Sequence, residues 1–255
     1  MRLYFMKRTL LSVALTLTSV SAMAQVPRCD INIDNELHLK NEQVSVYQQG
    51  KPKVVIDQNN DLFINGKKIT LNQTQENAVK AYREKVSEYI PKAKKIGDDG
   101  MTLANQVIDD ISASFNNSKA FDNVKTAVDG YYADIESRYY NNGEWVIKKD
   151  AVKDALSNWK QESAAAMQKF NGEFFSSAFA VLSEKMKTDG SVNLTELQTQ
   201  MTDMKKQIET RLQSQSQQLQ KEANAYCGNL HDLVSEEKTL HQQVPQLKNY
   251  SVFVE

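Results

Sequence analysis

The sequence predicts a predominantly helical α+β protein, with a small N-terminal antiparallel β element followed by about five long amphipathic helices. Three observations lead to this fold class. Only nine glycines and four prolines occur in 255 residues, which is low for a turn-rich all-β protein. Strand-like alternation is confined to residues 29–71, and helical spacing of apolar residues begins at residue 72. We therefore expect a leader over 1–24, a β element over 25–71 and a helical region over 72–255, the last two forming one domain.

The first 24 residues have the pattern of a cleaved secretory signal peptide. A positive start at Lys7 and Arg8 precedes the apolar run Leu10–Val20, and small residues stand at the −3 and −1 positions of a cleavage site between Ala24 and Gln25. A membrane anchor is the alternative, but a spanning helix needs about 20 apolar residues and this run is shorter. The pattern predicts export to the periplasm.

The charge of the chain gives no reason to expect a nucleic acid or an anionic lipid as partner. The whole chain has a formal net charge of −1. Cleavage after Ala24 would remove Arg2, Lys7 and Arg8 and no acid, leaving an acidic mature chain. No Lys/Arg stripe of the kind that nucleic acids require is visible, and no second apolar run approaches the length of a membrane span.

Two cysteines, Cys29 and Cys227, lie near the two ends of the predicted mature chain. In an oxidising compartment the simplest expectation for such a pair is one disulfide, which would tie the β element to the last helix. Two free thiols are the alternative; the sequence has no C-x-x-C spacing that would support redox catalysis.

The β element is expected to contain several short strands and one well-defined hairpin. Short alternating runs within 29–56 are separated by turn-forming residues. Asn65-Gly66 then lies between Leu62–Ile64 and 67–71, and this dipeptide favours a type I′ turn because both of its residues tolerate positive φ.

The helical region begins with a capping signal, in which Asn72 is the expected N-cap and Gln75 reaches back to it. The first helix should end near Pro91 or at the Gly97–Gly100 break. Four further helical stretches follow, over 101–115, 121–139, 152–186 and 194–233. Trp145–Ile147 is ambiguous, since it could begin a helix or form one added strand.

No catalytic, cofactor-binding or metal-binding motif is recognisable, so we expect no catalytic residue, cofactor or metal. Asp189-Gly190 imitates part of a calcium loop, but lysines occupy the positions of the first ligands. Glu237 and His241 lie one helical turn apart, and we interpret them as an exposed ion pair or a solvated histidine because no second histidine has metal-ligand spacing.

Aromatic residues provide the candidate binding surface. In the doublets Tyr131-Tyr132, Tyr139-Tyr140 and Phe174-Phe175 the two rings cannot share one helix face, so one of each pair must point partly outward. These rings could belong to the core with the hydroxyls at the surface, or they could line a groove for a ligand. The residues selected for a groove are Tyr132, Tyr140, Trp145 and Phe175.

The segment Val54–Pro91 resembles the YggN-like family of uncharacterised exported proteobacterial proteins, which carries a domain of unknown function. The resemblance rests on Phe63–Lys68 leading to Leu71, on the glutamine-rich helix start with Tyr82, and on an early and a late cysteine. It implies a periplasmic location and transfers no catalytic or binding residue.

Together these features predict a non-enzymatic periplasmic envelope protein that binds or scaffolds an envelope protein or peptide through amphipathic helices, with self-association through helices as a further possibility. Met201, Met204, Phe170 and Phe174 would supply adaptable apolar contacts. Two alternatives stay open: a hydrolase of envelope polymers with a carboxylate pair, and a chaperone-like clamp for unfolded outer-membrane proteins.

Overall fold

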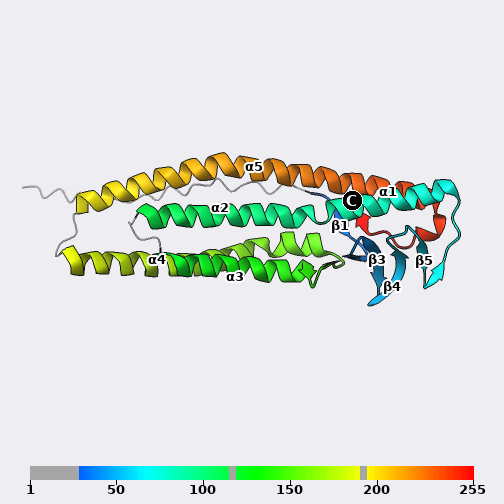
Figure 1. Cartoon of the computed structure of the whole chain (residues 1–255), viewed down its shortest axis with the longest axis horizontal. Helices are drawn as coiled ribbons and strands as arrows, with labels where there is room; N and C mark the ends of the chain where they lie inside the picture. The colour runs from blue at the N-terminus through cyan, green and yellow to red at the C-terminus, as the bar shows by residue number, and fades with distance from the viewer. Residues whose placement is uncertain (1–28, 115–118, 190–193) are drawn as a thin grey trace, which may run out of the picture.

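The computed structural model describes residues 29–114, 119–189 and 194–255. It is elongated, with a sheet at one end and a long helical arm at the other (Figure 1). The arm contains α2 (Lys92–Ser114), α3 (Asp122–Tyr139), α4 (Ala151–Asp189) and much of α5 (Leu194–Gln243). Helix α5 runs the full length of the molecule, from the far tip of the arm to the sheet. The predicted cleavage site at Ala24 and Gln25 lies outside the described residues.

Seven antiparallel strands form the main sheet, in the order β6-β5-β4-β3-β2-β8-β7. Their bounds are β2 (Glu36–Lys40), β3 (Gln43–Gln48), β4 (Lys51–Ile56), β5 (Leu62–Ile64), β6 (Lys67–Lys68), β7 (Tyr140–Asn141) and β8 (Glu144–Ile147). A separate two-stranded sheet joins β1 (Asn32–Ile33) to β9 (Phe253–Val254) at the other end of the chain.

The prediction of a small N-terminal β element followed only by helices is therefore wrong. Strands β7, β8 and β9 come from the middle and the end of the chain, and β8 pairs with β2 through Leu37 opposite Ile147 and Leu39 opposite Trp145. A strand this short has no periodicity of its own, and it exists because β2 offers it a free edge. Of the two alternatives for Trp145–Ile147, the structure has the added strand.

The hairpin at Asn65-Gly66 is confirmed. Both residues have positive φ, 49° and 76°, and Ile64 pairs with Lys67 across the turn. Asn142-Gly143 makes the same kind of turn between β7 and β8, with φ of 51° and 78°. A type I′ turn matches the right-handed twist of its strands, so these dipeptides fix the register of both hairpins.

Helix α1 (Gln73–Tyr89) starts as predicted, with the Asn72 side chain accepting from the Gln75 backbone N–H and the Gln75 side chain accepting from the Asn72 N–H. Its C-cap, Ile90, stands immediately before Pro91. The expected break at Gly97–Gly100 does not occur, because α2 continues through both glycines.

Helix α1 and the C-terminal part of α5 cover the apolar face of the sheet (Figure 1). The fully buried side chains at this interface include Leu37, Ile56, Val79, Val86 and Leu233. Arg83 of α1 is also buried, and its guanidinium binds Asn60 (2.8 Å) and Glu42 (2.9 Å), which lie in two turns of the sheet. A smaller second core lies further out in the arm, around Phe121.

The C-terminal tail returns to the sheet and is held there by Glu237. This side chain accepts hydrogen bonds from the backbone N–H of Val252 (2.8 Å) and Phe253 (3.0 Å) and from the Tyr82 hydroxyl (3.0 Å). Glu237 was expected to be exposed beside His241, but it is only 4% exposed. Burial raises its pKa to about 7, which outweighs the opposing effect of the three hydrogen bonds.

A disulfide joins Cys29 to Cys227, with 5.6 Å between the Cα atoms. It links the chain just before β1 to α5 and encloses a segment of 198 residues. A cross-link over so long a segment restricts the unfolded chain strongly.

Removing this cross-link should destabilise the protein. We expect the double variant Cys29→Ser/Cys227→Ser to lose about 2–5 kcal/mol of unfolding free energy in urea denaturation. A reducing agent should lower the wild-type midpoint to that of the double variant and should leave the variant unchanged. Equal midpoints for oxidised and reduced wild type would contradict a stabilising disulfide.

Glu237 should make stability fall as pH rises. Its pKa is about 7 in the folded protein against 4.5 as the ordinary value, so its contribution is fully present below pH 4.5 and is lost as pH rises through 7. We expect the difference in unfolding free energy between wild type and Glu237→Gln to shrink by about 2–3 kcal/mol from pH 5 to pH 8.

Glu236→Gln is the matched control for this titration, because Glu236 lies one residue away, is partly buried and pairs with Lys85 (2.6 Å). Its stability profile between pH 5 and pH 8 should run parallel to that of wild type. A constant difference between wild type and Glu237→Gln over this range would refute the assignment.

Candidate functional site

An apolar groove opens where the sheet meets the helical arm, and we call it the aromatic groove. Its volume is about 380 Å³. The walls come from the end of α1, from α2, α3, the β7–β8 hairpin, α4 and α5. Five aromatic residues line it, together with aliphatic side chains and one ion pair: Tyr132, Tyr139, Tyr140, Trp145 and Tyr226, with Ile90, Ala93, Lys94, Gly97, Ile135, Glu136, Ile147, Ala151, Val152 and Ala155.

The end of α3 positions the first part of the aromatic wall. Tyr139 is the last residue of the helix, and Tyr140 is its C-cap with an extended backbone, so the chain passes directly from helix into β7. Across the hairpin, Tyr140 is paired with Trp145, and the two rings lie 4.9 Å apart between centroids. The short turn therefore brings three aromatic residues from one chain segment to the same wall.

The β7–β8 hairpin is held on the sheet by a polar cluster on the other side. His38 of β2 bonds Glu144 of β8 through Nδ1 (2.7 Å) and Glu36 through Nε2 (2.7 Å), and its ring stacks on Tyr47 at 3.9 Å. The bond to His38 lowers the pKa of the Glu144 carboxyl. This cluster fixes the strand that carries Trp145.

The rim of the groove consists of Lys94 and Glu136, which line it, and of Asp98, which lies next to them and bonds to Lys94 and Tyr132. Lys94 Nζ lies 2.9 Å from Asp98 and 3.0 Å from Glu136, and the Tyr132 hydroxyl donates to Asp98 at 2.6 Å. These hydrogen bonds lower the pKa of Asp98 and raise that of Lys94 above its ordinary range. One cation and two carboxylates give the rim a formal net negative charge.

Gly97 allows Tyr132 to lie flat against α2. A Cβ atom at Gly97 would come within 2.9 Å of the Tyr132 ring and hydroxyl, closer than such contacts occur. Any larger residue would push the ring away from Asp98. The glycine predicted to end a helix thus serves close packing between α2 and α3 instead.

Three tyrosine hydroxyls at the groove have no partner within the described residues. These are the hydroxyls of Tyr139, Tyr140 and Tyr226. The indole N–H of Trp145 also makes no hydrogen bond within the described residues. Burial raises the pKa of Tyr226 to about 12 and also raises that of Tyr139. The three tyrosines are half-buried, and none of these four polar groups is among the enclosed polar atoms that lack a partner in the described chain. The groups are therefore accessible and can donate to a ligand.

The structure brings three of the four residues selected from the sequence to this groove, namely Tyr132, Tyr140 and Trp145. Phe175 is not among them. It lies on α4 with 69% of its surface exposed, one turn from Phe179, which is 73% exposed. Its neighbour Phe174 packs on Phe121 in the second core of the arm.

Tyr139, Tyr226, Lys94 and Glu136 were not selected from the sequence. Tyr139 could have been found, since it stands next to Tyr140 at the end of a predicted helix. Tyr226 is one of several apolar positions along α5, and nothing in the local sequence separates it from core residues. Tyr226 precedes Cys227, and the disulfide to Cys29 places this part of α5 near the sheet. Only this long-range link shows that Tyr226 lies near the groove.

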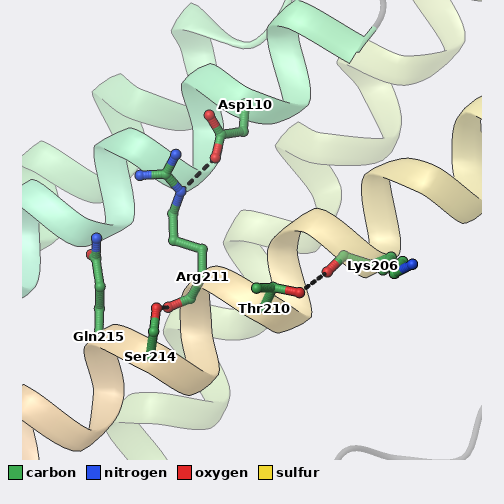
Figure 2. Close-up of a pocket in the computed structure, with 6 residues that line it drawn as sticks. All are labelled: Asp110, Lys206, Thr210, Arg211, Ser214 and Gln215. Atoms are coloured by element: carbon green, nitrogen blue, oxygen red, sulfur yellow. Dashed lines mark hydrogen bonds and ion pairs between the residues drawn. The ribbon is translucent and has the colours of Figure 1, made fainter.

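A second hollow lies between α2 and α5 in the arm, lined by polar side chains (Figure 2). Arg211 reaches from α5 to Asp110 of α2 (2.6 Å) and also bonds Gln106 (3.1 Å). The hydroxyls of Thr210 and Ser214 donate to backbone carbonyls of their own helix. The contacts of Arg211 therefore connect α5 to α2, and we interpret this hollow as part of the packing between the two helices.

Glu237, the carboxyl group whose pKa is raised, lines neither the aromatic groove nor the hollow between α2 and α5. Glu237 is enclosed by the tail, and both oxygens already accept hydrogen bonds. Among the residues of 29–114, 119–189 and 194–255, no group of three or more His, Cys, Asp and Glu side chains could hold a metal ion. No helix in the same ranges is long and apolar enough to cross a bilayer.

Comparison with known proteins finds no match among curated proteins and none among solved structures. A family model, by contrast, matches residues 29–253, from the first cysteine of the disulfide to β9, and so includes the sheet, the groove and the whole arm. Its description gives no activity. Because the match spans nearly the entire described chain, the protein belongs to this family, the proteins of unknown function DUF2884.

Proposed function

We propose that this protein is exported to the periplasm, where it acts as a non-enzymatic envelope protein that binds a partner protein or peptide in the aromatic groove. Two features support export. The signal pattern over 1–24 precedes the matched family region, and the bond between Cys29 and Cys227 is of a type that persists in oxidising compartments.

The observation that carries the binding role is the aromatic groove itself. Its volume lies at the lower end of the range of ligand sites. Its walls are apolar, with a few polar groups that make no hydrogen bond within the described chain. Among these groups, the hydroxyls of Tyr139, Tyr140 and Tyr226 are accessible, so they can donate to a bound ligand.

The charges at the rim support binding over hydrolysis. A general acid at a hydrolase site needs a raised pKa so that it carries a proton at neutral pH. Asp98 has a lowered pKa, and both it and Glu136 are paired with Lys94. The two carboxylates therefore act as fixed charges.

A smaller apolar surface on α4, formed by Phe175 and Phe179, is the place where we expect self-association or a second contact with the partner. Met201 and Met204, which the sequence suggested as adaptable contacts, have side chains outside the described part of the structure.

Export predicts a mature chain that begins at Gln25. Intact-mass measurement of the protein purified from the envelope of its own host should give the mass of residues 25–255 less two hydrogens for the disulfide. A chain that keeps residues 1–24, or that reacts with two equivalents of a thiol reagent before reduction, would contradict the proposal.

Blocking the groove should abolish partner binding. Ala155 lines the groove and is exposed on α4, so Ala155→Trp should fill the groove without disturbing the core. Ala165→Trp is the matched control, because Ala165 is exposed on the same helix outside the groove. In affinity capture from envelope extract, we expect Ala155→Trp to lose at least about 90% of the partner that wild type and Ala165→Trp retain, about 1.4 kcal/mol or more.

Circular dichroism should show that both variants keep the wild-type helix content. If Ala155→Trp captures the same proteins as wild type in the same amounts, the groove is not the partner site. If wild type captures nothing above empty resin, the binding role itself is contradicted.

A further inference from the structure

We infer that the aromatic groove binds an extended proline-containing segment of its partner, with a lysine or arginine beside the prolines. The inference rests on the proposed function and names the chemistry of the ligand. It combines three features of the groove: aromatic walls, hydrogen-bond donors without a partner, and a net negative rim.

The walls suit proline rings. The rings of Tyr140 and Trp145 pack on each other, with centroids 4.9 Å apart and planes tilted by 48°. Tyr139 and Tyr226 line the same groove. Aromatic-lined grooves recognise polyproline II segments because these are already extended before binding and lose little entropy. An apolar ligand such as an acyl chain would fit the walls alone.

The donors separate a peptide from an acyl chain. The hydroxyls of Tyr139, Tyr140 and Tyr226 and the Trp145 indole N–H have no partner in the described chain. A polyproline II segment makes no internal hydrogen bonds, so its backbone carbonyls are free to accept from these four groups. An acyl chain would leave all of them unsatisfied along most of its length.

The rim selects the charge beside the prolines. Asp98 and Glu136 both bind Lys94, and the Tyr132 hydroxyl donates to Asp98, so the three charges leave an excess of one negative charge. A lysine or arginine of the ligand would neutralise this excess negative charge, whereas an aspartate or glutamate would be repelled by it.

Titration of the protein with short peptides tests this inference. The sequence has two tryptophans, Trp145 and Trp159, so a Trp159→Phe background makes Trp145 the reporter of groove occupancy by fluorescence. The peptides are hexaproline flanked by two arginines, the same peptide with alanines for the prolines, and hexaproline flanked by two glutamates. Dodecyl maltoside below its micellar concentration is the acyl-chain probe.

We expect the arginine–proline peptide to bind at least tenfold more tightly than either of the other peptides. Asp98→Asn combined with Glu136→Gln should reverse the preference for arginine over glutamate, because Lys94 then leaves the rim positive. Tyr226→Phe should weaken binding about fivefold to tenfold without lowering stability, because its hydroxyl has no partner in the fold. Tyr131→Phe is the control, since Tyr131 packs on Phe170 outside the groove and should change neither quantity.

Equal binding of the alanine peptide would overturn the choice of proline, and equal binding of the glutamate peptide would overturn the role of the rim. Binding of dodecyl maltoside without binding of any peptide would assign the groove to acyl chains. In each case the inference fails. The proposed function fails separately, through the capture experiment with Ala155→Trp.

Discussion

The apolar face of the seven-stranded sheet has to be covered, and part of its cover comes from the opposite end of the chain. Leu233, Val234 and Leu240 of α5 pack with Val79 and Val86 of α1 over strands β2–β5. Burial of large aliphatic side chains is the main stabilising contribution in a domain of this size. The N-terminal strands therefore have no complete core until α5 has arrived.

Three further links strengthen this closure. The disulfide attaches Cys29, which precedes β1, to α5; β9 pairs with β1; and Glu237 holds the tail through two backbone N–H groups. The groove depends on the same closure, since Tyr226 stands next to Cys227 on α5 while Trp145 is carried by a hairpin added to the edge of β2. The groove is thereby built from elements that lie far apart in the sequence.

The sequence predicts features that depend on neighbouring residues and misses those that depend on distant partners. The Asn65-Gly66 turn and the Asn72–Gln75 capping box are fixed by local backbone conformation, so they could be read directly. Strand β8 could not, because only its pairing with β2 makes it a strand. Glu237 was expected at the surface, since no local signal shows that the tail will cover it. Phe175 was selected with Tyr140 because aromatic content does not reveal which side of a long helix faces a groove.

Tyr82 and Tyr226 differ in how the fold uses their hydroxyls. The buried Tyr82 hydroxyl donates to Glu237, so its burial is compensated within the fold. Tyr226 is half-buried in the wall of the aromatic groove, and its hydroxyl makes no hydrogen bond within the described chain. This hydroxyl is not among the enclosed polar atoms that lack a partner, so it is accessible from the groove. The fold therefore uses the hydroxyl of Tyr82, whereas that of Tyr226 stays free to donate to the ligand that we propose.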